Sequence, residues 1–226
     1  MHVPKAAGNA VRRLLVPAFG AGVAYLYDDF RSEGAFADRW PALRARAADG
    51  TLGAVHGHVP LDALRAAFPE AATMVWLRDP VDRVASYAAY WATRRRHGNP
   101  NHDAFLDGGA DPVALARRLQ GEVAGYLGAT AIEDVDFVGF TETFTEDAAR
   151  FEAFLAARTL PRRAWRRPVD RLARARLRAE VALAPVANRT RVRPALGADV
   201  RAELEAILAD ERAIYERARA HHARAR

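Results

Sequence analysis

The chain has 226 residues and no cysteine, which excludes disulfides, thiolate nucleophiles and cysteine metal sites. Half of its residues are hydrophobic, which excludes general disorder and allows one packed domain over residues 1–226. The net charge of +6 and the pI of about 10.2 favour an anionic partner: a phosphate-bearing cofactor, an acidic glycan or nucleic acid. The alternative is that the arginine and alanine content reflects a GC-rich coding sequence. Because no stretch resembles a membrane span or a signal peptide, we expect a soluble, cytoplasmic protein.

Short apolar runs alternate with amphipathic stretches along the chain. The predicted strands are 23–27 (VAYLY), 53–57 (GAVHG), 73–78 (TMVWLR) and 136–140 (DFVGF). The predicted helices are 9–15, 36–48, 61–68, 81–95, 112–127, 145–157 and 197–220. This alternation predicts a helix-rich α/β fold, a three-layer sandwich whose central sheet is mostly parallel. Two stretches read as irregular: a Gly- and Asn-rich loop at 96–112 and an arginine-rich surface segment at 158–178.

The stretch HVPKAAGN (2–9) has the features of a phosphate-binding turn. Gly8 allows a close backbone approach, and the N–H groups of the following helix point toward a bound anion. Lys5 adds a positive charge. The stretch does not fit the Walker A pattern, and a plain loop before a helix has a similar sequence.

A second stretch, VWLRDPVDRVASYAAYW (75–91), joins a strand to a helix. Arg78 is the last residue of the predicted strand, and open α/β sheets bind their ligands at the carboxyl ends of strands. Asp82, Arg83 and Ser86 share one helix face at spacings of three and four residues. The alternative is an ordinary charged helix start formed by Asp79, Asp82 and Arg83.

A third stretch, AVHGHVP (54–60), places His56 and His58 at a strand end. A neutral imidazole there can take a proton from a hydroxyl near neutral pH. Metal binding is the rival interpretation. It lacks an obvious third ligand, because four of the other histidines fall in loop or tail sequence: His97, His102, His221 and His222.

Together these stretches resemble the sulfotransferases that use 3′-phosphoadenosine-5′-phosphosulfate (PAPS). HVPKAAGNA resembles that family's 5′-phosphosulfate loop, WLRDPVDRVASYAAYW its 3′-phosphate segment, and HGHV the catalytic-histidine segment of its heparan sulfate uronyl 2-O-sulfotransferase branch. The stretch 137–155 is similar to a VG-x-TE-x-F segment of the family, and 187–218 to its closing segment and final helix. The resemblance covers almost the whole chain in order. It implies one sulfotransferase domain with a P-loop-NTPase-like fold.

The resemblance also implies roles for individual residues. His58 would deprotonate the acceptor hydroxyl, Lys5 would stabilise the leaving 5′-phosphate, and His56 would orient or assist. PAPS would be the co-substrate, no metal would be needed, and the acceptor would be a carbohydrate hydroxyl rather than nucleic acid. The residues that would contact PAPS are Lys5, Ala7, Gly8, Asn9, Ala10, Arg78 and Ser86.

Several alternatives stay open. Ala6, Asn9 and Ala10 stand where the family usually has hydroxyls, which allows a catalytically degenerate anion-binding protein. A nucleotide kinase is a third possibility, although this chain has no Walker A motif. Asp28 and Asp29 are the second choice of catalytic base. We also expect the strand that should precede the phosphate loop to lie upstream of His2, outside this sequence.

Overall fold

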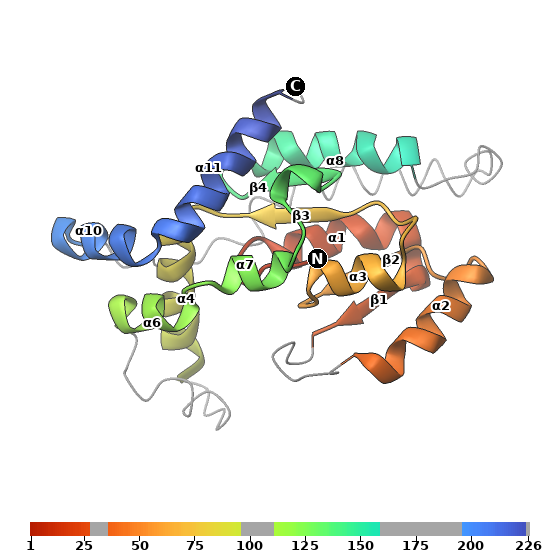
Figure 1. Cartoon of the computed structure of the whole chain (residues 1–226), viewed down its shortest axis with the longest axis horizontal. Helices are drawn as coiled ribbons and strands as arrows, with labels where there is room; N and C mark the ends of the chain where they lie inside the picture. Colours follow the sequence, from red (N-terminus) through yellow and green to blue (C-terminus); the bar gives the residue numbers. More distant parts are fainter. Residues whose placement is uncertain (28–35, 96–110, 159–195, 225–226) are drawn as a thin grey trace. The chain divides into compact units, whose positions relative to one another are not determined.

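The computed structural model describes residues 1–27, 36–95, 111–158 and 196–224. The chain divides into two compact units, the first formed by Met1–Leu77 and Tyr126–Asn188 and the second by Arg78–Gly125 and Arg189–Arg226. The described part is helix-rich and α/β (Figure 1). Each unit has a core of its own.

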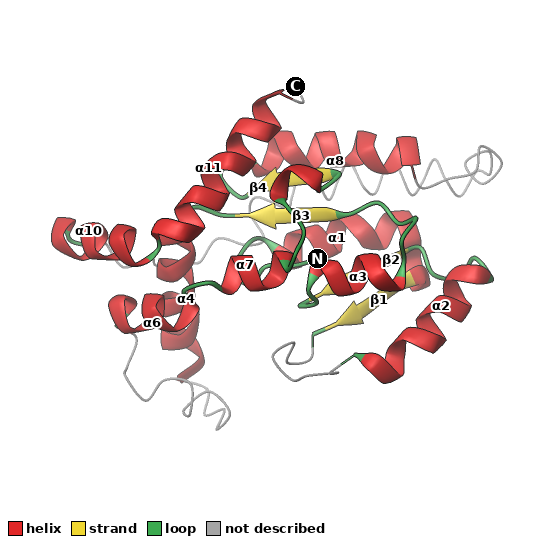
Figure 2. Ribbon diagram, viewed as in Figure 1, coloured by secondary structure: helices red, strands yellow, loops and turns green. Residues whose placement is uncertain are grey.

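Four short strands lie in the described part of the first unit, each within one residue of its predicted bounds. β1 (Val23–Leu26) pairs in parallel with β2 (Ala54–Gly57), and β3 (Met74–Leu77) pairs in parallel with β4 (Phe137–Phe140) (Figure 2). The prediction of parallel strands is therefore confirmed. In the described residues they form two two-stranded sheets rather than the single central sheet that we predicted.

The first two residues of the chain contact both strand pairs. The Met1 amine donates to the carbonyl oxygen of Met74 at 3.1 Å, at the start of β3. The His2 N–H donates to the carbonyl oxygen of Gly57 at 2.8 Å, at the end of β2. These bonds fix the segment that leads into the turn around Lys5.

Side chains on β1 alternate between two hydrophobic clusters, because successive residues of a strand point to opposite faces. Val23 and Tyr25 pack in a cluster with helices α1 (Gly8–Phe19) and α8 (Phe144–Arg158), which also holds Trp76 of β3 and Phe137 of β4. Ala24 and Leu26 pack in a second cluster with α2 (Trp40–Ala48) and partly buried side chains of α3 (Leu61–Ala67). Helices thus cover both faces of the β1–β2 pair.

Helices make up the described part of the second unit. They are α4 (Pro80–Arg95), α6 (Pro112–Leu119), most of α7 (Glu122–Leu127), α10 (Ala198–Ile207) and α11 (Ala209–Arg224). Apolar side chains of α4, α6 and α10 form their common core.

Two predicted helices are each divided in the structure. The helix predicted over 112–127 breaks at Gly121, whose φ of 76° is outside the helical region. The helix predicted over 197–220 breaks at Leu208, with φ −98° and ψ 22°. Both predictions were wrong about continuity. Hydrophobic periodicity continues across a short break, since a change of backbone direction at one residue leaves the pattern of apolar positions nearly intact.

Candidate functional site

The turn before α1 contains two left-handed residues that are not glycine. Lys5 has φ 64° and Ala7 has φ 62°. A residue with a Cβ in this region is less stable by about 1–2 kcal/mol, and such residues cluster at ligand-binding sites. Turns of this kind gather backbone N–H groups on their concave side, where anions bind. The sequence placed the conformational freedom of the turn at Gly8, whereas the structure places the unusual φ values at Lys5 and Ala7.

Gly8 has a packing role in addition to the one that we predicted. A Cβ on Gly8 would lie 1.9 Å from the ring atoms Cε1 and Nε2 of His2. The missing side chain of Gly8 therefore makes room for the His2 imidazole. This contact connects the turn to the end of β2, because His2 also bonds to Gly57 through its backbone.

The N-terminus of α1 suits an anion. Its N-cap is Ala7, which makes no side-chain cap hydrogen bond, and the first turn holds no acidic residue. The first N–H groups of a helix lack partners within the helix and favour negative charge. The N–H of Ala10 and that of Val11 both donate to the Ala7 carbonyl oxygen, at 2.8 and 3.0 Å. The N–H of Ala10, which we predicted to contact the donor, is thus already engaged inside the first turn.

Gly57 brings β1 close to the two histidines that flank it. A Cβ on Gly57 would lie 1.7 Å from the carbonyl oxygen of Leu26. The N–H of His58 donates to the same carbonyl oxygen at 2.7 Å. The spacing His-Gly-His is therefore explained by the close pairing of two strand ends, which brings the residue after β1 next to the histidines.

Three histidines and one tyrosine form a compact cluster, which we call the histidine cluster: His2, Tyr27, His56 and His58. The His2 ring stacks on His56 at 5.1 Å with an interplanar angle of 14°, and its centroid lies 4.9 Å from that of His58. Tyr27 Oη lies 2.6 Å from His56 Nδ1, a hydrogen-bond distance. The sequence did not single out His2 or Tyr27 as site residues. In the register of β1 against β2, Tyr25 lies opposite His56. This strand pairing is the feature that brings Tyr27, two residues after Tyr25, next to the histidines.

The rings of the histidine cluster are neutral at physiological pH. Burial lowers the pKa of His56 to about 3, with smaller contributions from the amino terminus, His58 and Arg12. Burial also lowers the pKa of His58 to about 4 and that of His2 well below its usual value. Burial raises the pKa of Tyr27 to about 12. A neutral imidazole that contacts a hydroxyl can accept its proton, so the cluster has the form needed for general base chemistry.

Several ring nitrogens of the histidine cluster are buried without a hydrogen-bond partner among the described residues. They are both nitrogens of His2 and the Nε2 atoms of His56 and His58. Buried polar atoms of native proteins are nearly always paired with protein, water or ligand. Their gathering beside an uncapped helix N-terminus points to a polar ligand at this place.

The metal interpretation gains no support from the described residues. No group of three or more His, Asp or Glu side chains there has an arrangement that could hold a metal ion. His221 and His222 lie in α11 of the second unit, so our assignment of them to loop or tail sequence was wrong. His97 and His102 lie outside the described residues.

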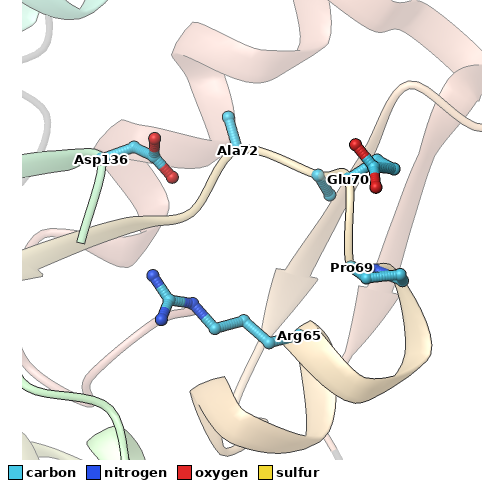
Figure 3. A pocket seen from close by; sticks show the side chains of 6 residues that line it. Arg65, Pro69, Glu70, Ala72 and Asp136 are labelled. Carbon is cyan, nitrogen blue, oxygen red and sulfur yellow. The ribbon is translucent and has the colours of Figure 1, made fainter. Parts of the chain in front are cut away.

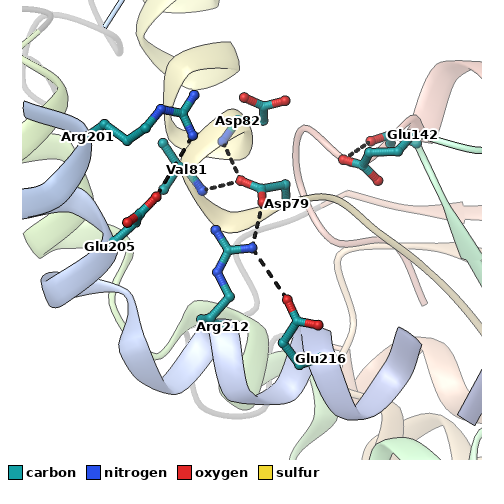
Figure 4. Close-up of polar contacts among 9 residues, drawn as sticks. Asp79, Val81, Asp82, Glu142, Arg201, Glu205, Arg212 and Glu216 are labelled. Atoms are coloured by element: carbon teal, nitrogen blue, oxygen red, sulfur yellow. Dashed lines mark hydrogen bonds and ion pairs between the residues drawn. The ribbon is translucent and has the colours of Figure 1, made fainter. Parts of the chain in front are cut away.

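Arg78 and Ser86, the predicted contacts to a 3′-phosphate, belong to the second unit. Arg78 directly follows β3 and is half-buried, and Ser86 is buried in α4. Asp79, between them, directly precedes α4. Its Oδ1 accepts from the N–H groups of Val81 and Asp82, and its Oδ2 accepts from Arg212 at 2.6 Å (Figure 4). Asp79 is thus a helix cap tied to α11, in agreement with the alternative reading of a charged helix start.

Arg83 is also structural. It is 1 % exposed and forms an ion pair with Glu122 of α7, while its Nη2 lies 3.9 Å from Glu211 Oε1 in α11. The helix face that we predicted for ligand contact is therefore turned into the core of the second unit at Arg83. Asp82 on the same face remains half-buried.

A depression of about 650 Å³ lies at the other end of the strands in the first unit. Arg65, Glu70 and Asp136 line it, with Pro69, Ala71 and Ala72 (Figure 3). Asp136 precedes β4, so the depression lies at the amino ends of β3 and β4, whereas α/β sheets bind ligands at carboxyl ends. Two of its polar side chains already have partners, because Arg65 donates to the Asp134 carbonyl oxygen and Asp136 accepts from Thr73. We assign no site there.

Asp28 and Asp29, the alternative base, lie outside the described residues, as does the arginine-rich segment after residue 158.

Within the described ranges, no helix is long and apolar enough to cross a bilayer. Comparisons with protein-family models, with curated proteins and with solved structures each returned no match.

Proposed function

We propose that this protein is a sulfotransferase that moves a sulfuryl group from PAPS to a hydroxyl, with a carbohydrate as the acceptor. The observation that carries the proposal is the contact between the turn around Lys5 and the histidine cluster. The His2 ring touches both, since it fills the space beside Gly8 and stacks on His56. An anion-binding turn next to a neutral base is what sulfuryl transfer needs.

In the proposed reaction the hydroxyl oxygen of the acceptor attacks the sulfur. A new S–O bond forms, the S–O bond to the 5′-phosphate breaks, and the acceptor proton passes to His58. Lys5 and the N–H groups at the start of α1 stabilise the charge that develops on the leaving phosphate. Both groups come from the first unit, at the carboxyl end of β2 and the turn that His2 connects to it.

Arg78 and Ser86 would hold the 3′-phosphate and separate PAPS from ATP. The position of Arg78 directly after β3 supports this role, because strand carboxyl ends carry the ligand contacts of α/β sheets. The finer fold prediction, a P-loop-NTPase-like sandwich, is part of the proposal. The attachment of residues 1–2 to both strand pairs supports it.

The second candidate is a non-catalytic anion-binding protein. Ala6, Asn9 and Ala10 favour it, because they remove hydroxyl donors from the turn. Each lost charge-assisted hydrogen bond weakens anion binding by about 1.5–3 kcal/mol.

Thermal unfolding with 3′,5′-adenosine bisphosphate, AMP and ATP separates these functions. Under the proposal the bisphosphate alone stabilises the protein, by about 2.7 kcal/mol at a hundredfold excess over its Kd. That corresponds to several degrees in Tm for a chain of this size. Lys5→Met and Arg78→Met should each reduce the shift, and Arg65→Met, in the depression away from the turn, is the matched control. Equal shifts from all three nucleotides would indicate the second candidate.

A further inference from the structure

The proposed function assigns no role to Tyr27 of the histidine cluster. It follows β1 directly and is 40 % exposed. Its Oη lies 2.6 Å from Nδ1 of His56, which is itself 1 % exposed. An exposed tyrosine bonded to a buried histidine is a strong constraint on that histidine, because a neutral imidazole carries one N–H and the bond decides which nitrogen bears it.

We propose that Tyr27 is a positioning residue that holds His56 in the tautomer with its proton on Nε2, so that His56 donates to a bound oxygen and His58 acts as the base. The role in transfer rests on the proposed function. The tautomer assignment rests only on the contacts within the histidine cluster.

The direction of the hydrogen bond follows from the chemistry of the two groups. A phenol O–H is a better donor than an imidazole N–H, and the imidazole lone pair is the better acceptor. Tyr27 is protonated over the working pH range, because a phenol ordinarily has a pKa of about 10 and partial burial raises that of Tyr27 to about 12. The O–H of Tyr27 therefore donates to Nδ1, and the single proton of the neutral His56 ring stays on Nε2.

This arrangement gives His56 and His58 different roles, His56 as a hydrogen-bond donor and His58 as the base. His56 has its acceptor nitrogen occupied by Tyr27, so it can only donate, from the buried Nε2 that has no partner among the described residues. His58 has no such bond to Tyr27; their rings meet edge to face at 5.1 Å. His2, stacked on His56, keeps the ring in its plane. A neutral N–H donor aimed at developing charge and a separate neutral base are complementary parts of one transfer site.

Nitrogen-15 NMR of histidine side chains in the whole chain measures the tautomer directly. The His56 resonance is identified by its loss in His56→Gln. We expect an unprotonated Nδ1 and a protonated Nε2 in the wild type at neutral pH, and a mixture of tautomers in Tyr27→Phe. Tyr25→Phe is the matched control. Tyr25 lies on β1, two residues before Tyr27, with its ring 6.3 Å from that of His56, and its substitution should change neither nitrogen. A proton on Nδ1 in the wild type, or an unchanged His56 spectrum in Tyr27→Phe, overturns the inference.

Kinetics test the role in transfer. Tyr27→Phe should lower kcat about three- to tenfold, the effect of one ordinary hydrogen bond, and leave the KM for PAPS unchanged. An unchanged kcat overturns the positioning role. If the bisphosphate fails to stabilise the wild type but the tautomer is as stated, the proposed function falls, and with it the assignment of His58 as base. The Tyr27–His56 assignment then stands by itself.

Discussion

The imidazole of His2 occupies the volume that a side chain on Gly8 would need. The two residues are six positions apart, at the two ends of the turn that carries Lys5, and the nearest ring atoms of His2 would be 1.9 Å from a Cβ on Gly8. The glycine of the turn is thus required by packing within the protein. The turn and the histidine cluster consequently share one residue, and a change on one side affects the other.

Gly8→Ala should destabilise the protein even though alanine is the better helix former. We expect the clash to lower the free energy of unfolding by about 1–3 kcal/mol, the usual effect of overpacking, and to displace His2 from His56. The double variant His2→Ala/Gly8→Ala removes the ring and should cost less than the sum of the single changes. Urea denaturation of the four proteins gives this double-mutant cycle. Additive effects would show that the two residues do not interact in solution.

His58→Ala should abolish most turnover and leave nucleotide binding intact. Loss of a general base commonly slows a reaction by roughly 10²- to 10⁴-fold. The Tm shift with 3′,5′-adenosine bisphosphate should stay at its wild-type size, whereas Lys5→Met should lose it. If His58→Ala keeps full activity in a PAPS-dependent transfer assay, the base lies elsewhere.

The histidine cluster should make the protein less stable in acid. His56 and His58 titrate near 6.5 when unfolded and at about 3 and 4 in the fold, because burial disfavours their charged forms. Between these values the unfolded state binds more protons. The contribution of the two rings is therefore complete above pH 6.5 and is lost as the pH falls toward the folded values. We expect a slope of up to about 1.4 kcal/mol per pH unit for each ring.

Unfolding curves recorded across this pH window test the acid effect. His56→Gln should reduce the slope. Tyr25→Phe, at the β1 position that pairs with His56, removes no imidazole and should keep it. A slope that is the same in His56→Gln and in the wild type would mean that His56 has the same pKa in the folded and the unfolded protein.

Glu211 should have the opposite dependence on pH. Burial raises its pKa above 4.5, partly offset by the positive charge of Arg83. Here the folded state binds more protons, so the stability from the protonated carboxyl is present below pH 4.5 and is lost as the pH rises through the folded pKa. Glu211→Gln should flatten this dependence. Glu216→Gln is the matched control on the same helix, since that side chain is 62 % exposed.

Asp79 should contribute to stability through two separate bonds, a helix cap and an ion pair with Arg212. Asparagine is also a good N-cap residue, so Asp79→Asn should lose mainly the charge and cost about 1 kcal/mol. Asp79→Ala should lose both and cost about 2 kcal/mol. Thermal unfolding of both variants, alone and with Arg212→Met, checks this order. An alanine variant as stable as the asparagine variant would show that the cap contributes nothing.

The local elements followed from the sequence because their signals are local. Each of the four strands is a short apolar run bounded by turn-forming residues, and each lies within one residue of its predicted limits. The helix starts at Pro80 and Pro112 were also within one residue, since proline is favoured in a first helical turn. The breaks at Gly121 and Leu208 were missed because a single residue of unusual conformation hardly alters the surrounding pattern.

The sequence by itself determined the α/β alternation and placed Lys5, His56 and His58 next to a turn or a strand end. Only the tertiary structure decided what surrounds them. It stacked His2 on His56, brought Tyr27 within hydrogen-bond distance, and turned Arg83 into a helical core. The reason is physical. Strand and helix signals come from neighbours along the chain, whereas ring stacking, tautomers and pKa values depend on groups that only the pairing of distant strands and helices brings together.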